Sequence, residues 1–518
     1  MRALAIAVFL VVGASVRPLP AQCPDGTPPP CGARVARGAA PAPTSVAVLS
    51  FDNRSRDTSD AFLAEGLADE ISTRLGQIGR LAIVSRSQVR RLRGVEDMAI
   101  PAIGRALNSA NLVQGTVQGT PTHLRVSVEL LRASNATTVW SHVYDRGRSD
   151  LLEIQGDIAT EVAQQITGTL RPGDRAVLAR TPTRNPEAYE HILRGDVLIG
   201  SRNRGQIAAA LREYQAAIGL DPASTRAYAS LAKGYTLCRD YSCPADLSLD
   251  TLIARTAAAA ATALRLDSSS AMAWAAVAYD GYMRPVAAGG AGVRAARRSV
   301  ELDSTDAEAW HFLGWLTELS GDDTSAVRAY RHALRIDPSR AVEYEHLSRI
   351  AIFNNRLTEG RALLDSALTI EPLYALGLYL RALLRAWQGD SAGARFDAEQ
   401  VARVTPGADP QAGIAAVRAF AAVRAGDTTG ARAILDHLDP ATMPSFVGLA
   451  GGKDALGYAL IGLGRMDEGI RQLLDLDTGF TSRYFVGTWS RLPYWDGART
   501  NPEVQRAIAE SARAWRGN

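Results

Sequence analysis

Apolar and small residues recur at a constant spacing in the middle of the chain. Within residues 307–340 they stand at fixed offsets, from Trp310 near the start to Pro338 near the end. The next unit keeps the same frame, because Tyr344 takes the place of Trp310 and Pro372 takes the place of Pro338. A third unit follows from residue 375. This period predicts helical hairpins stacked in register.

The offsets within residues 307–340 carry a family resemblance. They follow the pattern W-x2-L-G, A-x3-Y and P, and the unit resembles a tetratricopeptide repeat, a helix-turn-helix of about 34 residues. Weaker units extend the pattern to residues 185–477, and residues 478–518 are expected to form a degenerate helical cap. Such repeats bind partners on an extended concave surface. The residues that match the repeat pattern are Trp310, Leu313, Gly314, Ala326, Tyr330, Ala333 and Pro338.

Residues 44–173 show a different pattern. Short apolar runs at 45–51 and 81–85 alternate with amphipathic stretches, and three runs between 112 and 144 alternate with turn residues. The predicted order β-α-β-α-β-β-β-α gives a small α/β domain with a mixed sheet. The fold class is therefore α+β overall, with this domain followed by an all-α tetratricopeptide solenoid.

The same segment resembles the TolB amino-terminal-type domain, which is similar to the FlgO-type domain of flagellar outer-membrane proteins. That resemblance supplies no catalytic residues. Ser50 departs from the proline that is usual there. The matching positions include Val46, Phe51, Asn53, Phe62, Gly66, Val84, Arg86, Gly115, Arg125, Leu130, Trp140, Tyr144 and Ile158.

The first residues have the character of a secretory signal. Arg2 precedes the apolar run 3–16, and Ala21 offers a small residue for cleavage. The run is shorter than the ~20 residues that span a bilayer as a helix. We expect residues 1–21 to be removed and the protein to be exported to the periplasm or cell envelope, with no transmembrane helix in the mature chain; an uncleaved N-terminal anchor is the alternative. Residues 22–43 are rich in Pro, Gly and Ala and predict a linker.

The four cysteines form two local pairs, Cys23 with Cys31 and Cys238 with Cys243. An oxidising compartment permits disulfides, and free thiols are the alternative. Neither pair has the spacing of a zinc site, so no metal is expected.

Composition narrows the range of functions. The net charge is only +3 over 518 residues, and the basic residues are spread along the chain. A nucleic-acid surface is therefore not expected. The sequence contains no G-x-S-x-G motif and no Cys/His couple that would indicate nucleophilic catalysis. We expect a protein that is not an enzyme and holds no cofactor.

The first helix of each repeat lines the concave face in the family that the repeats resemble. Transferring those positions to this chain places aromatic and charged residues there, which are typical anchors for a protein or peptide partner. Packing between neighbouring helices is the alternative role for Trp315, Phe353 and Trp387. The candidate groove residues are His311, Trp315, Glu318, Glu345, His346, Arg349, Phe353, Tyr379, Leu383 and Trp387.

Together these patterns predict a non-catalytic exported scaffold that binds protein or peptide partners through the solenoid and docks through its N-terminal domain. The alternative is a sensory or accessory subunit of an envelope signalling system whose catalytic part is on another chain.

Overall fold

The structure is a computed structural model of the chain. It describes residues 41–56, 60–92, 98–179, 183, 185–200, 204–240, 247–283, 289–404, 410–439, 453–474 and 490–516. The predicted signal, most of the predicted linker, and Cys23, Cys31 and Cys243 lie outside the described residues.

The N-terminal domain is built on a mixed sheet, as the sequence predicts. Strand β1 (Ser45–Val48) lies between β3 (Ala82–Ile83) and β4 (Asn111–Gly119) and is parallel to both. The strands β4, β5 (His123–Arg132) and β6 (Thr137–Gly147) form an antiparallel meander. The predicted first strand is interrupted after Val48, and its continuation, β2 (Asp52–Asn53), pairs with β4. The sheet order is β3-β1-β4-β5-β6.

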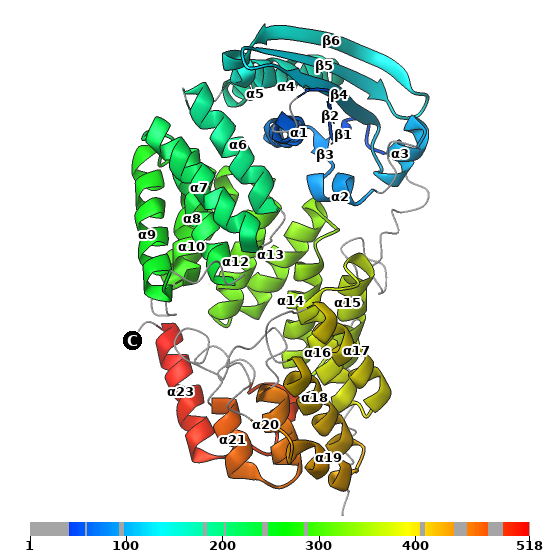
Figure 1. Cartoon of the computed structure of the whole chain (residues 1–518), viewed down its shortest axis with the longest axis vertical. Helices are drawn as coiled ribbons and strands as arrows, with labels where there is room; N and C mark the ends of the chain where they lie inside the picture. Colours follow the sequence, from blue (N-terminus) through cyan, green and yellow to red (C-terminus); the bar gives the residue numbers. More distant parts are fainter. Residues whose placement is uncertain are drawn as a thin grey trace, which may run out of the picture.

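Helices cover both faces of this sheet near β1. Successive residues of a strand point to opposite faces. Val46 and Val48 therefore join one core with α1 (Ala61–Gly76) and α4 (Leu151–Thr167). Ala47 joins a second core that includes residues of α2 (Arg86–Arg91) and α3 (Ile100–Ala106). Figure 1 shows this domain at the top, with β6 as the outer strand.

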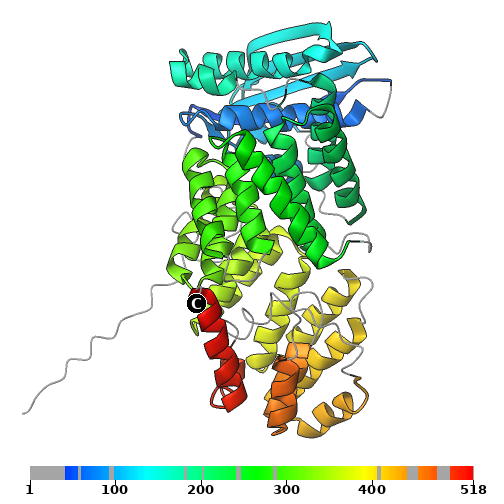
Figure 2. The same cartoon turned by 90° about the vertical axis from the view of Figure 1, so that its left-hand side faces the viewer.

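Helical hairpins follow from residue 186 and extend away from the sheet (Figures 1 and 2). They form the predicted solenoid after a short connecting helix, α5 (Pro172–Leu178). Among the described helices, none combines the length and apolar character needed to cross a membrane. The bounds are α6 (Pro186–Gly200), α7 (Arg204–Leu220), α8 (Thr225–Asp240), α9 (Leu249–Leu266), α10 (Ala271–Met283), α11 (Gly289–Leu302), α12 (Ala307–Leu319), α13 (Asp323–Ile336), α14 (Ala341–Phe353), α15 (Leu357–Ile370), α16 (Ala375–Trp387), α17 (Ser391–Val404), α18 (Pro410–Arg424), α19 (Thr428–Leu435), α20 (Lys453–Gly462), α21 (Met466–Leu474) and α23 (Pro502–Arg516).

The hairpin α12–α13 shows how the repeat residues set the fold. Asp306 caps α12 by accepting a hydrogen bond from the backbone of Glu308. Gly321 has a φ of 79° in the turn, a conformation that glycine adopts without strain. Gly314 faces the ring of Tyr330, and a Cβ atom there would lie 2.6 Å from Cε1 of that ring. The glycine therefore allows the two helices to approach closely.

The first solenoid helix is part of the core of the N-terminal domain. Tyr189 and Leu193 of α6 belong to the same buried cluster as α1 and α4. The hydroxyl of Tyr189 donates a hydrogen bond to the side chain of Gln155. Arg226 of α8 forms ion pairs with Glu70 of α1 and Asp196 of α6. Because these contacts are buried or half-buried, the sheet domain and the first repeats form a continuous packed unit.

Candidate partner-binding groove

The ten candidate residues lie on three consecutive first helices of the repeats. His311, Trp315 and Glu318 come from α12, and Tyr379, Leu383 and Trp387 come from α16. The remaining four come from α14, which lies between these two helices in the chain order: Glu345, His346, Arg349 and Phe353.

The residues of α12 and α14 meet in a buried network of charges. Arg349 Nε donates to Glu318 Oε1 at 2.9 Å, and Nη1 of the same arginine lies 3.0 Å from Glu345 Oε1. The hydroxyl of Tyr330 donates to Glu318 at 2.7 Å, and His346 Nδ1 lies 2.9 Å from the same carboxylate oxygen. Burial disfavours ionisation of Glu318, but Arg349 and His346 outweigh it and hold the pKa of Glu318 far below its usual range.

A second charged group continues this network along α14. Arg340 donates from Nε to Glu343 at 2.7 Å and from Nη2 to Glu308 at 2.8 Å. Nδ1 of His311 lies 3.2 Å from Glu343. Burial lowers the pKa of His311 in spite of this carboxylate. Arg340 and Glu343 are not among the sequence-predicted residues, although opposite charges three positions apart on one helix are a recognisable signal.

The residues of α16 belong to a separate, mostly aromatic cluster. The hydroxyl of Tyr379 donates a hydrogen bond to the carboxyl of Asp454 on α20. Burial of Asp454 raises the pKa of this carboxyl to about 6. Trp387 stacks with Phe420 of α18, and the guanidinium of Arg424 lies 3.8 Å from the centre of the indole ring.

The C-terminal segment Ser490–Trp495, which we call the return segment, lies against this aromatic cluster. The ring of Tyr494 lies 5.1 Å from that of Trp387, 5.7 Å from Phe420 and 5.2 Å from Tyr458. Leu492 and Tyr494 also line a gap together with Arg349 and Phe353 of α14. The segment therefore contacts the candidate groove across several repeats, whereas the sequence predicted only a cap at the end.

The candidate groove residues are mostly buried, whereas an open groove would expose them. Eight of the ten candidate residues are buried, and Trp315 and Trp387 are half-buried. The rings of Trp315 and Trp387 pack against neighbouring aromatic side chains, and Phe353 is enclosed in the core. All three therefore make packing contacts with neighbouring helices or with the return segment. Partner binding by the ten residues stays a prediction.

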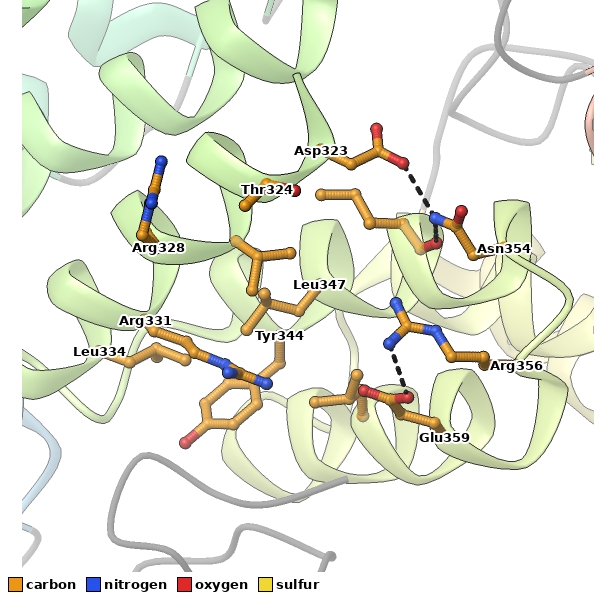
Figure 3. Close-up of a pocket in the computed structure, with 13 residues that line it drawn as sticks. Asp323, Thr324, Arg328, Arg331, Leu334, Tyr344, Leu347, Asn354, Arg356 and Glu359 are labelled. Atoms are coloured by element: carbon orange, nitrogen blue, oxygen red, sulfur yellow. Dashed lines mark hydrogen bonds and ion pairs between the residues drawn. The ribbon is translucent and has the colours of Figure 1, made fainter. Parts of the chain in front are cut away.

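A larger pocket lies between α13, α14 and α15. Its volume is ≈ 540 Å³. Arg328 and Arg331 project from α13, and Arg356 pairs with Glu359 on α15, as Figure 3 shows. This pocket has no counterpart among the sequence-predicted sites, because its lining comes mostly from second helices.

Among the described residues, neither possible metal ligands nor cysteines form a second candidate site. Within the described ranges, no group of three or more His, Cys, Asp or Glu residues is placed to hold a metal ion. Cys238 is disulfide-bonded, and every other cysteine of the chain lies outside the described residues. The predicted pairing with Cys243 therefore stays a prediction.

Comparison with known proteins agrees with the repeat architecture. The helix pairs define a helical-repeat protein. Residues 307–340, the hairpin α12–α13, match the tetratricopeptide repeat family. The chain thus contains a tetratricopeptide repeat at the place where the sequence pattern is strongest.

Other known proteins match the chain in part. A curated protein of Rhizobium meliloti (strain 1021), named "Putative adenylate cyclase 3", is 26% identical over 192 residues, which are 37% of this chain and 32% of that protein. The chain thus matches about a third of the length of this relative. One similar solved structure is the APC/C hetero-tetramer Cut9-Hcn1, with 12% identity, a TM-score of 0.41, and coverage of 70% of this chain and 63% of that chain. Another is YrrB, described as a TPR protein with an unusual peptide-binding site, with 18% identity, a TM-score of 0.26, and coverage of 38% and 92%.

Proposed function

We propose that the protein is a non-catalytic scaffold that binds a protein or peptide partner along the first helices of its repeats. The observation that carries this proposal is the return segment, because a piece of chain already lies across α14, α16, α18 and α20. Binding of a segment by its side chains is the way in which repeat surfaces hold peptides. No cofactor is needed for this activity.

The N-terminal domain is proposed to dock a second component, in keeping with its resemblance to the TolB amino-terminal-type and FlgO-type domains. Strand β6 supports this role, since β5 is its partner in the described sheet and most of its residues are exposed or half-buried. An edge strand of this kind can accept another strand. The buried contacts of α6 with α1 would hold the two binding surfaces in a fixed relation.

Export is proposed from the N-terminal sequence. Sequencing of the mature protein isolated from its own cells should find Gln22 at or near the terminus. Recovery of Met1 would instead support the anchored alternative.

Photo-crosslinking in the native cell tests the scaffold proposal. A photoreactive amino acid in place of Trp315, a half-buried residue of the first-helix row, should capture a specific protein. The matched control replaces Phe396, which is 56% exposed on the second helix α17. Capture at neither position, or equal capture of the same proteins at both, would contradict binding along the first helices.

The second candidate function is an accessory subunit of a signalling system. The partial similarity to the protein named as an adenylate cyclase favours it. The two functions differ in the captured partner, which would be a nucleotide cyclase or another signalling enzyme in the second case. Purified chain should form no cyclic nucleotide in either case, and measurable turnover would contradict both.

A further inference from the structure

The return segment makes hydrogen bonds of its own besides its contacts with the solenoid. Backbone hydrogen bonds close within the segment and the turn that follows it: Trp495 donates to Leu492, and Arg499 donates to Trp495. The side chain of Arg499 also donates to the carbonyls of Ser490 and Leu492, at 2.6 and 2.7 Å. These bonds fix the shape of the segment together with the turn that follows it.

Side chains make the polar and aromatic contacts of the return segment with the repeats. Arg491 Nη2 lies 2.7 Å from Asp323 at the start of α13 and donates to Asn354 at 3.0 Å. Trp495 is fully buried, and its Nε1 donates to the hydroxyl of Tyr458 at 3.3 Å. Recognition by one charged anchor and two aromatic anchors is the pattern of a peptide interface, in which few residues carry most of the affinity.

The fit between this segment and the groove is close. The gap that Leu492 and Tyr494 leave against α14 and α16 is ≈ 10 Å³, which is at the lower limit for one water molecule. Asp323 and Arg491 are 168 residues apart in the chain. Repeats far apart in the sequence thus build this site together, and the return segment fills it closely.

We propose that residues 490–495 are an internal ligand of a peptide site on α14, α16, α18 and α20, and that an external partner with an Arg-Leu-Pro-Tyr-Trp-like segment binds this site only after the internal segment leaves. The proposal rests on the proposed scaffold function and specifies its ligand: a basic residue followed by an aliphatic residue, proline and two aromatic residues. The chain would thereby limit its own partner binding.

Binding of a synthetic peptide to the full chain tests this competition. The probe is a fluorescently labelled peptide with the sequence of residues 490–501, and binding is followed by fluorescence anisotropy. The Leu492→Ala/Tyr494→Ala chain should bind it about tenfold or more tightly than the wild-type chain, because loss of two anchors weakens the internal competitor. The same peptide carrying Tyr494→Ala should not bind.

Two further variants keep the test decisive if the double variant folds poorly. Arg491→Ala removes a contact of a side chain that is 35% exposed, so the core stays intact and peptide binding should increase to a smaller degree. Adding Trp387→Ala to either chain should abolish binding, since Trp387 forms one wall of the site. Circular dichroism melting of each chain identifies those that are folded.

Several results would overturn the proposal. Equal binding of the peptide by wild-type and Arg491→Ala chains, or no binding by any folded variant, would show that the segment is ordinary packing. A wild-type dimer that dissociates on Leu492→Ala/Tyr494→Ala substitution would show that the segment of a second copy fills the site. Specific capture at Trp315 together with a negative peptide assay would refute this inference alone and leave the scaffold function standing.

Discussion

Replacement of Glu318 by glutamine should weaken the middle of the solenoid strongly. Glu318 is only 1% exposed and accepts hydrogen bonds from Tyr330 and Arg349, with His346 at 2.9 Å. Glutamine keeps the size of the side chain and removes its charge. Arg349, which is 8% exposed, then loses one of its two carboxylate partners while it stays buried.

The size of the effect follows from the burial of this pair. Removal of one partner from a buried ion pair costs about 3–5 kcal/mol, because the other charge stays in a site of low polarity. Arg349 keeps its ion pair with Glu345, so we expect a loss of stability at the lower end of this range, about 3 kcal/mol. The exposed pair of Arg298 and Glu301 gives the matched control, and Glu301→Gln should cost less than about 0.5 kcal/mol.

Hydrogen exchange measured by mass spectrometry is the suitable assay, since it reports the opening of α12 and α14 separately from the rest of the chain. A loss of about 3 kcal/mol corresponds to roughly a hundredfold faster exchange of the amides of α12 and α14 that open together. Combining Glu318→Gln with Arg349→Met should cost less than the sum of the two single changes, because no charge is left unpaired. Unchanged exchange in Glu318→Gln, or strict additivity, would refute the reasoning.

The same carboxylate gives the solenoid a defined response to acid. The folded-state pKa of Glu318 is lowered, so its contribution is fully present above the unfolded value of about 4.3. That contribution is lost as the pH falls below this value toward the lower folded pKa. Protection of α12 and α14 in the wild-type chain should therefore decrease below about pH 4. The Glu318→Gln chain should show a smaller decrease, because the pKa of Glu343 on α14 is also lowered and its contribution remains.

Three other changes test separate features of the fold. The pKa of Asp454 is raised to about 6, so its stabilising contribution is present below the unfolded pKa and is lost as the pH rises through 6. Asp454→Asn should therefore stabilise the chain by about 3 kcal/mol at pH 7.5 and not at pH 3.5, and equal melting shifts at both values would contradict this. Gly314→Ala should destabilise by about 1–3 kcal/mol through its contact with Tyr330, whereas Gly79→Ala, which has no atom within 4 Å, serves as the thermal-melting control. Thiol labelling of the denatured chain without reductant should leave Cys238 unmodified, and labelling there would disprove the disulfide.

The repeat frame could be predicted from the sequence because its causes are local. The units expected at residues 307, 341 and 375 begin where α12, α14 and α16 begin. Each unit needs only a small residue that faces an aromatic ring, and a turn at a fixed offset. The sequence of one repeat therefore contains the residues that identify it. The mixed sheet was also predicted, while the short elements β2 and α2 were missed because such brief segments show no reliable period.

The state of the groove could not be predicted in the same way. The family resemblance placed Phe353, Leu383 and Trp387 on one surface, and in the structure the return segment lies beside all three. The segment that covers this surface is held by contacts between residues far apart in the chain. The repeat period does not predict such contacts. Arg491 reaching Asp323 is one such contact.

Arg349 connects the two parts of the candidate groove and gives them different roles. Its guanidinium belongs to the buried charge network of α12 and α14, and its side chain also lines the gap beside Leu492 and Tyr494. Residues 343–353 of α14 are all buried, so this helix presents no exposed side chain there while the return segment is in place. The aromatic surface of α16, α18 and α20 is instead the part that a segment of chain occupies. The charge network therefore acts as a fixed wall, and any peptide that replaces the return segment must pack against the side of Arg349 that Glu318 and Glu345 hold in place.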